Sequence, residues 1–198
     1  MLEKERQLLF GIPGPEAGLG TRDEGRGTRD QGLGTCKMAG MDDKRHMLRH
    51  FLGALAYRTQ KAVRDAPEAF ADFRAGNDVR TPRELVRHMT SVLGYARTFF
   101  IGGKYWPEPL PTFDDEIERF HEMLGALRTH LESGAPLVGL TEEQLLQGQL
   151  SDAMTHAGQL AMLRRLYGLP VRSENFIHAA ISHENLTRDQ PAPIAPDD

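Results

Sequence analysis

Cysteine is almost absent from this chain of 198 residues, in which Cys36 is the only one. A single cysteine forms no internal disulfide and cannot supply the several thiolates of a structural zinc site. Long apolar runs are also missing, because no stretch approaches the roughly 18 apolar residues that a membrane-spanning helix needs. The apolar segment at residues 8–10 is too short for the core of a signal peptide. We therefore expect a cytoplasmic protein with no membrane association.

The chain also has no strong excess of one charge sign. Charged residues make up 26% of the sequence and the formal net charge is -4, with basic residues scattered along the chain. Nucleic-acid binding usually needs a basic patch or stripe, so we expect no nucleic-acid partner. With 39% hydrophobic residues, the chain can build one domain with a proper core.

Glycine is concentrated near the N-terminus, where residues 18–35 read GLGTRDE, GRGTRDQ and GLGT. Such a repeat has glycine where a core needs apolar side chains, which predicts that residues 1–40 are disordered. Two interpretations are open: a flexible tether, or a mis-annotated start with Met38 or Met41 as the true first residue. Residues 191–198, rich in proline and ending in two aspartates, are predicted to be a disordered tail.

The pattern of residues 41–190 is typical of one all-α domain. Apolar residues recur at helical spacing over residues 42–65, 82–101, 114–132 and 150–167. Thr81 and Glu84 form a capping box around Pro82, and Thr141 with Gln144 forms another before a short helical turn. Without strand-like alternation, the sequence predicts an up-and-down four-helix bundle. We also expect a short C-terminal helix at residues 174–181.

Polar residues on the inner faces of two of these helices are candidate metal ligands. Asp152 and His156 lie one turn apart on the apolar face of the last long helix, and His88 lies at the edge of the apolar face of residues 82–101. A carboxylate and imidazoles facing a core are costly unless they are paired or coordinated. Together they would form a three-ligand site for one divalent ion, namely Zn, Ni, Fe or Mn.

Simpler interpretations of these residues are also open. An inward histidine is often a hydrogen-bonded core residue, and Asp152 with His156 would also make a buried ion pair. Asp152 lies near the expected helix start, where Ser151 competes for the capping position. His46 and His50 share the same spacing, but they fall opposite the apolar stripe of their helix and are predicted to be solvated. His121 also lies away from the apolar stripe of its helix, and Arg164 is expected to point away from the core.

The segment TPRELVRHM, which contains His88, and the later phrase DAMTHAGQL, which contains Asp152 and His156, resemble the DinB/YfiT-like superfamily. This resemblance implies a four-helix bundle with a metal held by a histidine of the second helix and a later His-x-x-x-His pair. His88 matches the first ligand and His156 the last. Asp152 stands where the family usually has its middle histidine.

The resemblance implies an enzyme in which the metal acts as a Lewis acid, of thiol S-transferase or hydrolase type. A small-molecule substrate, such as a low-molecular-weight thiol, would then be the partner. Gln159 would orient a ligand or support the site, and Tyr95 would line the pocket. The alternative is a non-catalytic, stress-related helical protein that binds a small ligand and has a degenerate metal site. A homodimer is the expected oligomer, because such bundles often pair through a helix face.

Overall fold

The computed structural model describes residues 33–76 and 78–194 of the chain. Contacts between residues divide the chain into Met1–Gly34 and Thr35–Asp198, and the description below concerns the second unit. All regular structure in the described residues is helical, so the prediction of an all-α protein is confirmed. The long helices are α2 (Leu33–Val63), α3 (Pro82–Ile101), α4 (Phe113–Glu132) and α6 (Ser151–Leu166). Shorter helical segments are η1 (Glu68–Phe70), α5 (Glu142–Leu145) and η2 (Leu146–Leu150).

Side-chain caps determine where several helices begin. The Thr81 hydroxyl accepts a hydrogen bond from the backbone N–H of Glu84, and the Glu84 carboxylate accepts one from the N–H of Thr81. The capping box predicted at Thr141 is also present. A third capping box, at Thr112, starts α4 and was not predicted. Each box satisfies backbone donors that the first turn of a helix leaves free.

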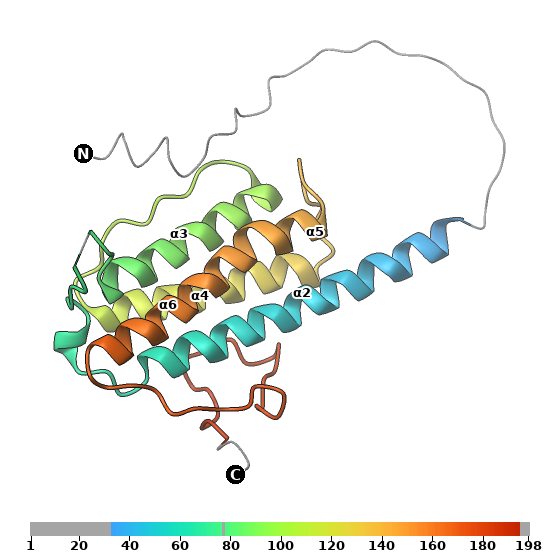
Figure 1. Cartoon of the computed structure of the whole chain (residues 1–198). Coiled ribbons are helices and arrows are strands. Elements are labelled where there is room, and N and C mark those ends of the chain that lie inside the picture. The colour runs from blue at the N-terminus through green and yellow to red at the C-terminus, as the bar shows by residue number, and fades with distance from the viewer. Residues whose placement is uncertain (1–32, 77, 195–198) are drawn as a thin grey trace. The chain divides into compact units, whose positions relative to one another are not determined.

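The long helices share one hydrophobic core. Leu52 of α2, Leu93 of α3, Leu124 of α4 and Leu160 of α6 are all fully buried in it. Helix α3 packs against both α4 and α6, and the long helices run in roughly a common direction (Figure 1). This arrangement brings α3 and α6, the two helices that carry the candidate ligands, into direct contact.

The N-terminal predictions are only partly within the described residues. Helix α2 begins at Leu33, earlier than the predicted start at Asp42. Residues 1–32 lie outside the described part of the chain, so the disorder predicted for residues 1–40 stays a prediction there.

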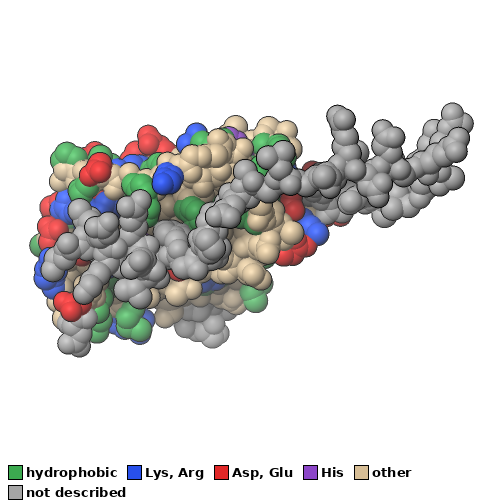
Figure 2. Space-filling view, turned by 90° about the horizontal axis from the view of Figure 1, so that it is seen from above, with side chains coloured by type: hydrophobic (Ala, Val, Ile, Leu, Met, Phe, Trp, Pro, Cys, Tyr) green, Lys and Arg blue, Asp and Glu red, His purple; other side chains and the backbone are tan. Residues whose placement is uncertain are grey.

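None of the described helices combines the length and apolar character needed to cross a bilayer. On the face shown in Figure 2, the described Lys and Arg side chains lie among Asp and Glu side chains and form no broad basic patch.

The helix predicted at residues 174–181 is wrong, because the segment forms turns instead. The Asn175 side chain accepts a hydrogen bond from the backbone N–H of Ile177, which is a local bond that competes with helix formation. The Glu174 carboxylate bonds to a distant helix rather than to the next turn, because it accepts hydrogen bonds from Tyr57 and Lys61 of α2, each at 2.6 Å.

The rest of the C-terminal segment is also attached to the helices. Leu186 is buried in the core, and its carbonyl oxygen lies 2.7 Å from Nδ1 of His121 on α4. Arg128 of α4 donates hydrogen bonds to the backbone carbonyls of His183 and Glu184. Within the predicted tail of residues 191–198, the N–H of Ile194 donates to Glu174 at 2.9 Å; residues 195–198 lie outside the described residues.

Candidate metal centre

Three potential metal ligands converge between α3 and α6. His88 of α3 and Asp152 and His156 of α6 each offer one ligand atom, and these atoms all lie within 4.8 Å of one another. The imidazole rings of His88 and His156 meet edge to face, with centroids 4.7 Å apart. Nε2 of His156 lies 3.3 Å from Oδ1 of Asp152. The structure therefore brings together the residues that the sequence selected.

The surroundings of His156 favour one form of its ring. Nδ1 lies 2.7 Å from Oε1 of Gln159, so an Nδ1–H donates a hydrogen bond to this amide oxygen. In the neutral ring, Nε2 then carries the lone pair and faces Asp152 and His88. Metal-binding histidines commonly have this arrangement, in which the second ring nitrogen donates to an outer oxygen and so fixes the tautomer. Gln159 thus contacts a candidate ligand, and its predicted supporting role stays a prediction.

The electrostatics of the three groups differ. Burial, helped by the positive charges of Arg80 and His156, lowers the pKa of His88 to about 4, so its ring is neutral at pH 7. The hydrogen bond to Asp152 raises the pKa of His156, and the same bond lowers the pKa of Asp152. A neutral imidazole and an ionised carboxylate are the protonation states that metal binding requires.

Arg80 is a feature of this site that the sequence analysis missed. It precedes α3 in the chain, and its positive charge affects the pKa values of His88, Asp152 and His156 alike. No helical periodicity could indicate it, because it lies before the capping residue Thr81. Its proximity to the three groups depends on how the start of α3 packs beside α6.

The helix that carries Asp152 begins well before this residue. α5, η2 and α6 follow one another without interruption from Glu142 to Leu166, so Asp152 is not a capping residue. η2 is a π-helical turn, and the Ser151 hydroxyl donates to the Leu146 carbonyl at 2.7 Å. Such widened turns often lie at functional sites. In the same turn, the Gln149 side-chain oxygen is buried and has no hydrogen-bond partner among the described residues.

The donor set suits a divalent transition metal. Two imidazole nitrogens and one carboxylate oxygen are ligands for Zn, Ni, Fe(II) or Mn, and three protein ligands leave positions open for a substrate or water. Atoms bound about 2.1 Å from one ion lie roughly 3–4 Å apart, so small side-chain rotations would close the present separations. His156 is buried, whereas the Asp152 side chain is 49% exposed, which leaves one side accessible.

Other histidines and polar residues have different surroundings. His46 and His50 are exposed, as predicted. His121 is only 4% exposed, although the periodicity of its helix placed it away from the apolar stripe. Arg164 was expected to point away from the core, but it is buried and donates to backbone carbonyls, including that of Ala62. Tyr95 packs edge to face on Phe99, and its predicted place in the pocket stays a prediction.

The fold and the site together define a helical protein with a candidate site for one divalent metal ion. The chain matches no protein-family model, no curated protein and no solved structure. What the protein does must therefore be inferred from its own residues and from the motif around them.

Proposed function

We propose that this chain is a DinB/YfiT-like, up-and-down four-helix bundle that binds one divalent metal ion through His88, Asp152 and His156. We further propose that it is a metal-dependent enzyme of thiol S-transferase or hydrolase type. The observation that carries the proposal is the convergence of the three ligand atoms within 4.8 Å at the contact of α3 and α6. The hydrogen bond from His156 to Gln159 supports it, because it directs Nε2 toward the shared position.

The metal would supply Lewis acidity, either toward a thiol held as thiolate or toward a water molecule in hydrolysis. The protein's own contribution lies in its charges. Arg80 adds a positive charge beside the three ligands, so it favours a substrate that carries a negative charge. The hydrogen bond that Gln159 accepts keeps the His156 ring in one orientation. A low-molecular-weight thiol with an acidic group would satisfy both Arg80 and the open metal positions.

One observation favours a second candidate function, a non-catalytic binding protein with a degenerate site. Asp152 and His156 satisfy each other at 3.3 Å without an ion, because the carboxylate raises the pKa of the imidazole. A pair of this kind is stable by itself, and the exposure of Asp152 lowers its desolvation cost. In that case His88 would be a partly buried neutral histidine with no ligand role.

The metal content of the purified protein distinguishes the metal-dependent enzyme from the non-catalytic binding protein. Plasma mass spectrometry would be applied to the untagged wild-type chain and to the variants His88→Ala and His156→Ala. His50→Ala is the matched control, because His50 has the same i, i+4 partner spacing with His46 but is exposed. We expect near one equivalent of metal in the wild type and in His50→Ala, and loss of the metal in the other two variants.

Thermal unfolding adds a second measurement. A metal at about 100 times its dissociation constant stabilises a protein by about 2.7 kcal/mol, or roughly 5–10 °C in Tm for a chain of this size. The increase should disappear in His156→Leu. If wild type takes up no metal even after reconstitution, and apo His156→Leu is as stable as wild type or more so, the degenerate site is correct and the enzyme proposal is wrong. Stoichiometric metal would justify thiol-transfer and hydrolysis assays.

A further inference from the structure

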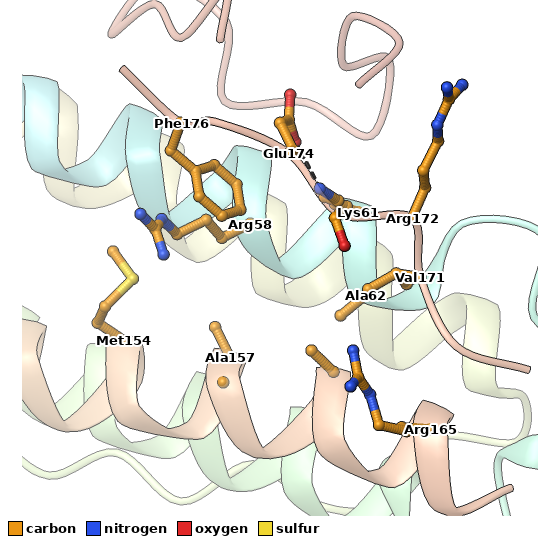
Figure 3. Close-up of a pocket in the computed structure, with 13 residues that line it drawn as sticks. Arg58, Lys61, Ala62, Met154, Ala157, Arg165, Val171, Arg172, Glu174 and Phe176 are labelled. Atoms are coloured by element: carbon orange, nitrogen blue, oxygen red, sulfur yellow. Dashed lines mark hydrogen bonds and ion pairs between the residues drawn. The ribbon is translucent and has the colours of Figure 1, made fainter. Parts of the chain in front are cut away.

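A cavity of about 370 Å³ lies between α2, α6 and the segment of residues 171–176 (Figure 3). This volume is within the range of about 300–1,000 Å³ that is typical of small-molecule sites. The residues of α6 that line it recur at three- and four-residue intervals: Met154, Ala157, Gly158, Ala161 and Arg165. Since a helix turns by about 100° per residue, they form one face of α6. Asp152, His156 and Gln159 fall on the opposite face, so the cavity is separate from the candidate metal centre.

Basic side chains outnumber acidic ones around this cavity. Its lining contains Arg58, Lys61, Arg165 and Arg172 but only one carboxylate, Glu174. Lys61 and Glu174 neutralise each other through a bond of 2.6 Å between Nζ and Oε2, and both side chains are largely buried. The arginines are therefore the charges left for a ligand.

One of the arginines is placed to meet a ligand inside the cavity. Arg165 extends from α6 toward the space between α6 and α2, near Ala62 and Val171, whereas the Arg172 side chain points away (Figure 3). Arg58 lies at the other end of the cavity, on the Met154 side (Figure 3). The Arg58 guanidinium stacks on the Phe176 ring at 3.7 Å from its centroid, which orients the group without neutralising it. Within the described residues, neither Arg58 nor Arg165 has a carboxylate within ion-pair distance.

The remaining lining of the cavity is mostly apolar. It consists of the small side chains of Ala62, Ala157 and Ala161, together with Val171, Met154 and the Phe176 ring. Small residues on facing helices leave the volume open, and Met154 adapts to different ligand shapes. A ligand that fits these surfaces has an apolar body and a group that accepts hydrogen bonds from a planar guanidinium.

We propose that this cavity binds a small amphiphilic carboxylate, with the carboxylate on Arg165 and the apolar body against Ala157, Ala161 and Val171. Arginine and carboxylate match in geometry because the guanidinium donates two parallel N–H bonds to two oxygens. A neutral molecule would leave the Arg165 guanidinium unmatched. Inorganic phosphate would leave the apolar surface unused.

Gly158 offers a way to close the cavity without damage to the fold. A Cβ added there would meet no atom within 4 Å, because Gly158 faces the open space of the cavity. Replacing a glycine in a helix with leucine also raises helix propensity. Gly158→Leu should therefore fold normally and fill the volume that the ligand needs, and circular dichroism checks the fold.

Isothermal titration calorimetry of the full chain with octanoate, octanamide and inorganic phosphate, in EDTA, tests the proposal. We expect octanoate to bind at one site, octanamide to bind at least about tenfold more weakly, and phosphate not to bind. Arg165→Gln should weaken octanoate binding about tenfold and Gly158→Leu should abolish it. The matched control Arg172→Gln removes the same charge from the rim and should change affinity by no more than about twofold.

Several results would overturn the proposal. Equal binding of octanoate and octanamide would show a purely apolar cavity, and phosphate binding as tight as octanoate would show a simple anion site. Octanoate binding that survives Gly158→Leu would place the ligand elsewhere, and no binding at about 1 mM octanoate would exclude the site. His156→Ala should bind octanoate like wild type, so failure of the metal proposal leaves this one unaffected.

Discussion

Replacing Gly53 by alanine should detach the C-terminal segment from α2. Gly53 is buried in the middle of α2, and a Cβ there would lie 2.6 Å from the carbonyl oxygen of Ser182 and 2.8 Å from its carbon. Real Cβ contacts do not occur below 3.0 Å, and both atoms belong to the backbone. The segment cannot shift easily, because Arg128 holds the next carbonyls and Leu186 is buried in the core.

Two opposing effects determine how much Gly53→Ala changes the free energy of unfolding. Alanine is favoured over glycine within a helix by about 1 kcal/mol, while overpacking of a tightly packed site costs about 1–3 kcal/mol. Gly125 of α4 provides the matched control, because a Cβ there meets nothing within 4 Å. Gly125→Ala should therefore be stabilised by the higher helix propensity of alanine, with no overpacking to oppose it. We expect Gly53→Ala to be less stable than Gly125→Ala by about 1–3 kcal/mol.

Urea unfolding followed by circular dichroism measures both variants against wild type. Limited proteolysis provides an independent check, because a detached segment should be cut within residues 170–194 in Gly53→Ala but not in Gly125→Ala. Equal stability of the two variants, with equal protection of the segment, would refute the close approach of Ser182 to α2 and the reasoning built on it.

Further predictions concern other buried contacts. Burial lowers the pKa of His121 to about 4 from its ordinary 6.5. As the pH drops, the unfolded state therefore takes up the proton before the folded state does. The free energy of unfolding should fall by about 3 kcal/mol between pH 6.5 and pH 4. The free energy of unfolding of the apo protein should depend less steeply on pH in His121→Asn than in wild type, and this difference separates the effect of His121 from the similar one of His88. Equal pH dependence in the two proteins would contradict the prediction. Gly94→Ala should cost about 1–3 kcal/mol, because its Cβ would lie 1.9 Å from the Tyr105 ring. Urea unfolding of the double variant with Tyr105→Ala should show less than additive loss, and strict additivity would count against the contact. Glu116→Ala removes a fully buried carboxylate that pairs with arginines and accepts a hydrogen bond from the N–H of Leu110. Urea unfolding should therefore show a loss of about 3–5 kcal/mol in the free energy of unfolding. A loss below about 1 kcal/mol would contradict the prediction.

Local features were the most predictable from the sequence. The start of α3 follows from Thr81, Pro82 and Glu84 because a capping box is a contact between residues close in the chain. The all-helical character follows from the spacing of apolar residues, which reflects helical geometry itself. His88, Asp152 and His156 could be selected because periodicity placed them on or beside inner faces and because the motif around them resembles a known one.

The predictions from the sequence were wrong where segments distant in the chain determine the surroundings of a residue. His121 lies outside the apolar stripe of α4, but the C-terminal segment covers it and supplies the Leu186 carbonyl as its partner. Arg164 is buried because the backbone carbonyls of Ala62 and Arg64 accept its hydrogen bonds. The predicted helix near Glu174 fails because α2 provides that residue with better partners than a helical turn would.

The sequence by itself therefore determined the helical class, the start of α3 and the three candidate ligands, since each depends on spacing along one helix or on a short motif. Only the tertiary structure decided that these ligands meet within 4.8 Å, because this distance depends on how α3 packs against α6. The cavity between α2, α6 and residues 171–176 was likewise invisible beforehand. Its lining residues are far apart in the chain, and no local pattern records which of them will face one another.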